Sequence, residues 1–122
     1  MVFDHVGLNV KDYPASRAFY EAALAPLGYE VVTDFADWKA VGFREGETEL
    51  WVAEREPCGT GTHVAFVCAD RATVDAFHAA AVGAGGLDNG APGIREQYHP
   101  TYYAAFVLDP DGNNIEAVCQ HG

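Results

Sequence analysis

Positive charge is scarce in this chain. Seven Lys and Arg residues stand against eighteen Asp and Glu residues, which gives a formal net charge of −11 at pH 7. A surface of this sign repels the phosphate backbone of nucleic acids and the anionic face of a membrane. Neither nucleic acid nor a membrane is therefore expected as a partner.

Long apolar stretches are missing as well. The sequence has no early apolar segment typical of a secretion signal and no run long enough to span a bilayer. Its three cysteines, Cys58, Cys68 and Cys119, are an odd number without the spacing of a disulfide framework. Such a set suits a reducing compartment, so we expect a cytoplasmic protein.

Several common catalytic and nucleotide-binding motifs are also absent. The sequence contains no Gly-rich phosphate loop, no Cys-x-x-Cys pair and no Gly-x-Ser-x-Gly turn. What it does contain is 49% hydrophobic and 12% aromatic residues in a length of 122, enough to bury one core. We therefore predict one globular domain over residues 1–122.

The beginning of the chain is repeated in its second half. Residues 4–24 can be laid over residues 62–82 at a constant offset of 58, with identical residues at seven of twenty-one positions and no gap. His5 falls on His63 in this alignment. We therefore predict an internal duplication, with repeat one over about 1–54, a linker over about 55–61 and repeat two over about 62–122.

Each repeat has the pattern of a strand, a helix and three further strands. The strands and helix expected in repeat one cover residues 3–10, 15–27, 29–34, 38–44 and 48–53. In repeat two, a strand and helix from residue 62 precede a Gly-rich turn over 83–90 and strands near 93–97, 102–108 and 114–119. Because each repeat has one helix to cover its sheet, the predicted fold is α+β, with two βαβββ repeats forming a curved mixed sheet around a central cavity.

The segment 109–116, Asp-Pro-Asp-Gly-Asn-Asn-Ile-Glu, predicts a tight turn that leads directly into the last strand. On that strand Ile115 and Cys119 lie on one face, which is apolar, and Glu116 lies on the other. If the repeats are related by a pseudo-twofold axis, His5 and His63 face one cavity and Glu116 can reach the same point.

Two imidazoles and one carboxylate form a facial triad that leaves metal coordination sites open for water or substrate. This donor set suits Fe, Mn, Ni or Zn, and the sequence does not choose between them. The alternative is that His5 and His63 are core histidines and Glu116 is a surface charge. We favour a metal site because two of the three groups are related by the repeat.

Polar aromatic residues crowd into segment 95–103, which suggests the rim of a substrate pocket. His99 and Tyr103 are the candidates for acid–base catalysis. The expected substrate-binding residues are Trp51, Tyr98, Tyr102, Arg95 and Asn114, and either Arg44 or Arg95 could pair with a substrate carboxylate. Tyr102 and Tyr103 point to opposite faces of a strand, so only one of them can face the cavity. An ordinary loop with surface tyrosines is the alternative.

Taken together, these motifs resemble the vicinal oxygen chelate superfamily, which includes glyoxalase I, bleomycin-resistance proteins, fosfomycin thiol transferases and extradiol dioxygenases. The resemblance covers nearly the whole chain and rests on the segments Asp4-His5-Val6, Phe19-Tyr20, Leu27-Gly28, His63-Val64-Ala65 and 109–116. It implies that His5, His63 and Glu116 stand at positions where metal-dependent members carry ligands. It also implies a small-molecule substrate and a homodimer.

Glyoxalase I carries a fourth ligand on the last strand of its first half, and here that strand includes Glu49 and Trp51 on one face. Aligning the strand on its hydrophobic residues places Trp51 at the ligand position, as in the thiol-transferase members, which use three ligands. Aligning Glu49 with Glu116 restores four. We favour Trp51 as a pocket wall because Glu49 lies near a charged turn.

Two functions follow from the resemblance. The first is a glyoxalase-like enzyme that uses a divalent metal ion and a substrate chelating it through two oxygens, with lyase/isomerase, transferase and dioxygenase chemistry all open. The second is a non-catalytic ligand-sequestering protein of the bleomycin-resistance type, in which the same residues bind one another or a ligand.

Overall fold

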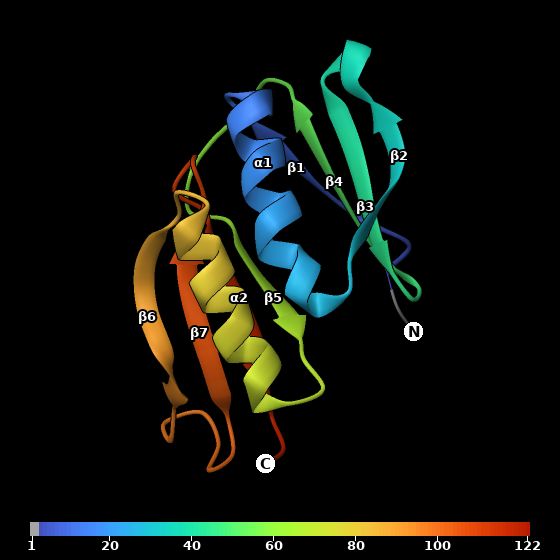
Figure 1. Ribbon diagram of the computed structural model, residues 1–122. Coiled ribbons are helices and arrows are strands. Elements are labelled where there is room, and N and C mark those ends of the chain that lie inside the picture. The colour runs from blue at the N-terminus through green and yellow to red at the C-terminus, as the bar shows by residue number, and fades with distance from the viewer. Residues whose placement is uncertain (1–2) are drawn as a thin grey trace.

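The computed structural model describes residues 3–122 and contains two successive βαβββ units (Figure 1). The first unit consists of β1 (Val6–Val10), α1 (Tyr13–Leu24), a 3-10 turn η1 (Ala25–Leu27), β2 (Glu30–Phe35), a second 3-10 turn η2 (Ala36–Trp38), β3 (Ala40–Glu45) and β4 (Thr48–Glu54). The second unit consists of β5 (His63–Val67), α2 (Arg71–Gly83), β6 (Leu87–Ile94), β7 (Tyr103–Leu108) and β8 (Asn114–Cys119). The predicted α+β class and the duplicated element order are confirmed.

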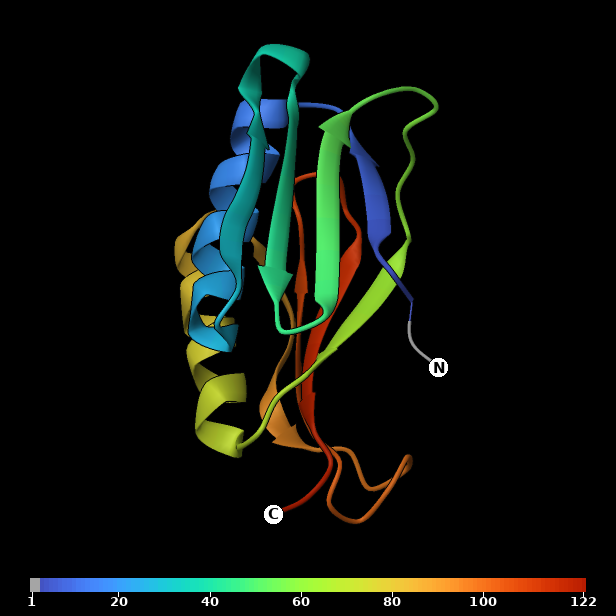
Figure 2. The same ribbon diagram turned by 90° about the vertical axis from the view of Figure 1, so that its right-hand side faces the viewer.

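The two units form separate four-stranded sheets with the same topology. Their strand orders are β1-β4-β3-β2 and β5-β8-β7-β6. In each sheet the first and last strands of the unit pair in parallel, and the other neighbours are antiparallel. Figure 2 shows the two sheets one in front of the other, with both helices along the same side.

Both helices begin in the same way, as the repeat predicts. Asp12 precedes α1, and its carboxylate accepts a hydrogen bond from the backbone N–H of Ala15. Asp70 precedes α2 and accepts one from the backbone N–H of Thr73. These contacts satisfy amide groups that have no partner inside the first turn of a helix.

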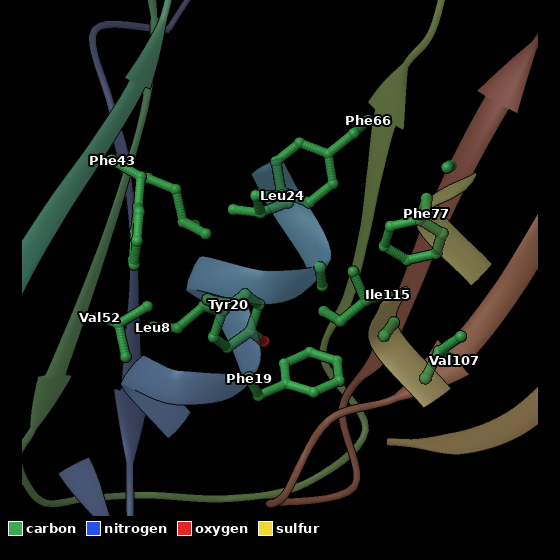
Figure 3. Packing of buried hydrophobic residues seen from close by; sticks show 14 of the residues in the cluster. Leu8, Phe19, Tyr20, Leu24, Phe43, Val52, Phe66, Phe77, Val107 and Ile115 are labelled. Atoms are coloured by element: carbon green, nitrogen blue, oxygen red, sulfur yellow. The ribbon is translucent and has the colours of Figure 1, made fainter. Parts of the chain in front are cut away.

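Helix α1 lies between the two sheets and joins their hydrophobic cores (Figure 3). Its residues Phe19, Tyr20 and Leu24 are fully buried. Side chains from both sheets point toward them: Leu8, Phe43 and Val52 from the first, and Phe66, Val107 and Ile115 from the second. Since each sheet turns its core face toward α1, the opposite faces of the two sheets are free of helices and point away from the core. We call these the helix-free faces.

The turn before β8 is fixed by a buried carboxylate. Asp109 accepts hydrogen bonds from the backbone N–H groups of Asp111 (2.9 Å) and Asn113 (2.8 Å). It also accepts one from the hydroxyl of Tyr20 on α1, at 2.5 Å. The Asp109 contact therefore links the first unit to the turn that positions Glu116 in the second.

Three predicted elements differ from the structure by three or more residues at one end. Strand β1 begins at Val6 instead of Phe3, and α1 ends at Leu24, three residues earlier than expected, where Pro26 allows only a 3-10 turn. Of the predicted strand near 93–97, only residues 93 and 94 lie in a strand, at the end of β6, which starts within the expected Gly-rich turn. β6 is an edge strand whose register shifts on both sides of Gly90, and edge strands tolerate the glycines that suggested a turn.

Across residues 3–122, no helix has the length and apolar character needed to cross a membrane.

Candidate metal and substrate site

The helix-free face of the second sheet carries a buried carboxylate. β5 and β8 pair in parallel with Ala65 opposite Glu116, so His63 and Glu116 lie on neighbouring strands and point to the same side. Ile115 and Ala117 alternate with Glu116 and are buried against the helices. The Glu116 residue is only 1% exposed, although it lies on the face without helices.

Glu116 is held by two side chains. Its Oε1 lies 2.8 Å from Nε2 of His63, and its Oε2 accepts a hydrogen bond from the hydroxyl of Tyr102. Burial, and then the hydrogen bond to Glu116, raises the pKa of Tyr102 to about 12. Tyr102 therefore keeps its proton at neutral pH and acts as a donor.

The His63 and Glu116 atoms fit a shared metal ion. Ligand nitrogens and oxygens lie about 2.0–2.2 Å from such ions, so two neighbouring ligand atoms lie about 3 Å from one another. The observed separation of 2.8 Å is close to this value. Nε2 of His63 and Oε1 of Glu116 are within hydrogen-bond distance, and the Nε2 lone pair can bind a metal ion when the ring carries its proton on Nδ1.

His5 does not join this pair within the chain. Nδ1 of His5 lies 2.7 Å from the carboxylate of Asp4, and its side chain is 55% exposed. His5 and His63 both line an open cavity of about 710 Å³ near the starts of β1 and β5, but Glu116 is not among the lining residues. Within residues 3–122, no three His, Cys, Asp or Glu side chains gather closely enough to hold a metal ion.

The first sheet places a tryptophan at the position equivalent to Glu116. Gly7 pairs with Trp51 in the first unit, and Ala65, which is 58 residues after Gly7, pairs with Glu116 in the second. The indole N–H of Trp51 donates to the carboxylate of Glu49 at 2.5 Å.

Glu49 also forms an ion pair with Arg44 at 2.5 Å. Arg44, and then Trp51, lowers the pKa of Glu49. The strand register therefore agrees with the alignment in which Trp51, not Glu49, matches Glu116.

Of the two neighbouring tyrosines, Tyr102 is the one that contacts Glu116. Tyr103 points to the opposite face, where its hydroxyl donates to Asp75 on α2 at 2.6 Å and its ring stacks under Arg71. Tyr103 is therefore separated from the His63–Glu116 pair by the sheet, although it was expected at the catalytic centre.

The loop between β6 and β7 holds two more of the expected residues. Tyr98 is 64% exposed and packs edge-on against Tyr102, with ring centroids 5.1 Å apart. His99 is exposed, and its Nδ1 accepts a hydrogen bond from the backbone N–H of Thr101. The acid–base role of His99 stays a prediction.

Arg95 and Asn114 are the remaining residues that were predicted to bind the substrate. Asn114 is the strand partner of His63, and its side-chain oxygen accepts from Asn89 at 3.3 Å. Arg95 stacks over the ring of Phe106, which is the strand partner of Glu116.

Phe106 was not singled out from the sequence as a site residue. The strand alternation places it on the same face as Tyr102, and that was the available signal. Its ring lies 6.3 Å from the ring of His63, between centroids.

Comparisons with known proteins agree on one family. The family model described as "Glyoxalase/Bleomycin resistance protein/Dioxygenase superfamily" matches residues 2–117. A glyoxalase/bleomycin resistance protein from Albidiferax ferrireducens T118 is 30% identical, with 96% of this chain and 97% of that chain covered and a TM-score of 0.82. No curated protein sequence matches the chain.

More distant structures share the fold. Lactoylglutathione lyase from Agrobacterium tumefaciens is 20% identical, with 97% of this chain and 92% of that chain covered and a TM-score of 0.72. A glyoxalase/bleomycin resistance protein/dioxygenase family enzyme from Burkholderia phytofirmans PsJN is also 20% identical, with 96% and 97% coverage and a TM-score of 0.72.

Proposed function

Because the chain belongs to the glyoxalase/bleomycin resistance protein/dioxygenase superfamily, we propose that it is a metal-dependent enzyme acting on a small molecule that offers two neighbouring oxygens. His5, His63 and Glu116 would hold the ion. The observation that carries the proposal is the buried pair of His63 and Glu116, whose facing atoms are 2.8 Å apart. When bound, a divalent ion supplies Lewis-acid polarisation of the substrate.

The residues around this pair have separate tasks in the proposed reaction. Tyr102 donates to Oε2 of Glu116 and so fixes the carboxylate with Oε1 toward His63. The Phe106 ring beside His63 offers a flat apolar wall for the substrate and keeps water away from it. His99, on the exposed loop, is the proposed group for proton transfer.

We further propose that the site forms between two copies of the chain. The support is the orientation of the helix-free faces, which point away from the core on both sheets, and the exposure of their residues. The side chain of His63 is 51% exposed and Val67 is 85% exposed. A second copy that brings its His5 to this face would complete the three-ligand set and cover the exposed apolar surface.

Metal analysis of untagged protein tests the first part of the proposal. Purified wild type is expected to contain close to one divalent ion per chain, and His5→Ala and Glu116→Ala are expected to lose it. Trp51→Phe is the matched control, because it changes the position equivalent to Glu116 without removing a ligand, and it should retain the metal. Wild-type protein that binds no Fe, Mn, Ni or Zn, even when reconstituted, would rule out the metal enzyme in favour of a ligand-sequestering protein.

Mixing the two ligand variants tests the second part. If each site takes His5 from one chain and Glu116 from its partner, a His5→Ala/Glu116→Ala mixed dimer has one intact site. Random exchange of subunits should then restore metal at about a quarter of the sites of wild type. No restoration, in a mixture shown by native mass spectrometry to contain mixed dimers, would place the site within one chain.

A further inference from the structure

Arg95 is fixed in one orientation on the helix-free face of the second sheet. One terminal nitrogen of its guanidinium donates to the backbone carbonyl of Gly93 at 2.8 Å, and the other donates to that of Ala91 at 2.8 Å. The guanidinium carbon lies 5.3 Å from the centre of the Phe106 ring. Backbone carbonyls and an aromatic face therefore hold the group in place and leave several of its five N–H donors available.

The charge of Arg95 has no acidic partner within 4.0 Å among residues 3–122. Arg44, the other basic residue considered as a carboxylate partner, is paired with Glu49 at 2.5 Å. Arg95 therefore keeps an unpaired positive charge in a chain whose formal net charge is −11. Its free donors suit a planar anion, which two parallel N–H groups can bind together.

Arg95 also lies close to the proposed reaction site. Phe106 pairs with Glu116 in the sheet, and its ring lies 6.3 Å from the ring of His63 and 5.3 Å from the guanidinium of Arg95. One short molecule lying beside Phe106, between Arg95 and His63, can therefore reach both Arg95 and the His63–Glu116 pair.

From this arrangement we infer that Arg95 binds a carboxylate, and that the substrate is a small carboxylic acid with a flat or apolar body. This inference rests on the proposed function for the identity of the reacting end, because His63 and Glu116 would meet the substrate there. The proposed binding of the substrate carboxylate depends on Arg95 alone and not on the metal ligands. Neutral analogues should bind much more weakly, because they cannot form charge-assisted hydrogen bonds with the guanidinium.

Benzoate and benzamide form a matched pair of probes for this inference, since they share size and shape and differ in charge. NMR titrations of each into the protein, as purified and again after treatment with EDTA, measure both affinities. We expect wild type to bind benzoate about tenfold more tightly than benzamide in both preparations. Arg95→Gln should lose this preference.

Arg55→Gln is the control variant. Arg55 also donates to backbone carbonyls, those of Trp38 and Glu54, and has no acidic partner within 4.0 Å among the residues described, but it does not stack on Phe106. The Arg55→Gln variant should keep the wild-type preference for benzoate. Should Arg95→Gln fail to fold by circular dichroism, Arg95→Lys replaces it: it retains the charge without the two-pronged geometry and should keep only part of the preference.

The carboxylate site is refuted by an absence of saturable benzoate binding, by equal affinities for the two probes, or by a preference that persists unchanged in the Arg95 variants. Metal content measured on the same samples separates this result from the fate of the enzyme proposal. Metal without a benzoate preference removes the carboxylate site alone. A benzoate preference in a protein that binds no metal leaves the carboxylate site standing and removes the metal enzyme.

Discussion

The two sheets carry different residues at equivalent positions: Glu116 on β8 of the second sheet corresponds to Trp51 on β4 of the first. The residues that pair with them on the neighbouring strands also differ, but there the aromatic residue is in the second sheet. Trp51 pairs with Gly42 on β3, and Glu116 pairs with Phe106 on β7. A Cβ atom at Gly42 would lie 2.9 Å from the Trp51 ring, so glycine is needed there to let the indole lie flat. Each helix-free face thus carries one aromatic ring at this level, but the ring comes from a different strand.

This difference in the position of the aromatic residue explains how two sheets with the same topology present different surfaces. In the first sheet, Trp51 stands at the position equivalent to Glu116. Together with Phe35, whose ring centroid is 6.0 Å from that of Trp51, it forms an aromatic surface. In the second sheet the ring moves to β7, which opens β8 for Glu116 and its partners. Facing copies of the two surfaces would combine an apolar wall with a polar centre, as substrate pockets commonly do.

The largest difference in stability between the halves is expected on the helices. Tyr20 on α1 and His78 on α2 are equivalent in the repeat. The Tyr20 hydroxyl is buried and donates to the buried Asp109, whereas His78 contacts the exposed side chain of Asp88 at 2.9 Å. Removing the Tyr20 hydroxyl leaves a buried carboxylate short of one donor.

Tyr20→Phe should therefore lower the free energy of unfolding by about 1–3 kcal/mol, and His78→Gln by much less. Burial, followed by the charge of Asp109, raises the pKa of Tyr20 above its ordinary value of 10.0. The stabilisation from this group is therefore complete below about pH 10 and is lost as pH rises through the raised value. Urea unfolding at pH 7 and pH 9 should give the same difference between wild type and Tyr20→Phe, and equal effects of the two variants would contradict the comparison.

A smaller effect is expected from the partner of Glu116. Counting back from the equivalent residues Gly42 and Phe106, Tyr102 corresponds to Trp38, which is 72% exposed and packs on Phe35. Tyr102→Phe should weaken metal binding about tenfold, because the carboxylate is no longer fixed on its Oε2 side.

Trp38→Phe is the control and should leave metal affinity unchanged. Isothermal titration with zinc gives both affinities independently of any enzyme assay. A Tyr102→Phe protein with wild-type affinity would show that His63 alone is enough to orient Glu116.

Most of the fold could be predicted because the two repeats align at a constant offset of 58 without a gap. The match of His5 with His63 and Asp12 with Asp70 fixed the offset, and strand alternation then assigned the faces. The prediction was least accurate at β6, where glycines in an edge strand resemble a turn. Periodicity and composition cannot distinguish these two cases, because sheet pairing supplies the missing information.

The candidate site could be predicted only in part. The pairing of His63 with Glu116 follows from parallel register, and the match of Trp51 with Glu116 follows from counting in both sheets. Which of Tyr102 and Tyr103 meets Glu116 depends on a face assignment that the sequence left open. The fixed orientation of Arg95 depends on backbone carbonyls in β6, and no motif encodes these contacts.

The helix caps provide the smallest expected difference between the halves. Asp70 accepts from the backbone N–H of Thr73 at 2.8 Å and from its hydroxyl at 2.7 Å, whereas Asp12 accepts only from the N–H of Ala15, at 3.2 Å. The Thr73 hydroxyl, and then its N–H, lowers the pKa of Asp70 below its usual value of 3.8. The stabilisation from this carboxylate is therefore present above about pH 3.8 and is lost as the pH falls through the lowered value.

Asp70→Ala should accordingly reduce Tm more than Asp12→Ala at pH 7, and the effect of Asp70→Ala should shrink toward pH 3. Thermal denaturation followed by circular dichroism at the two pH values measures both differences. An effect of Asp70→Ala that stays the same at pH 3 would mean that side-chain packing, not the charged cap, stabilises the start of α2. The second half would then owe its helix to its contacts with the sheet, as short helices in proteins often do.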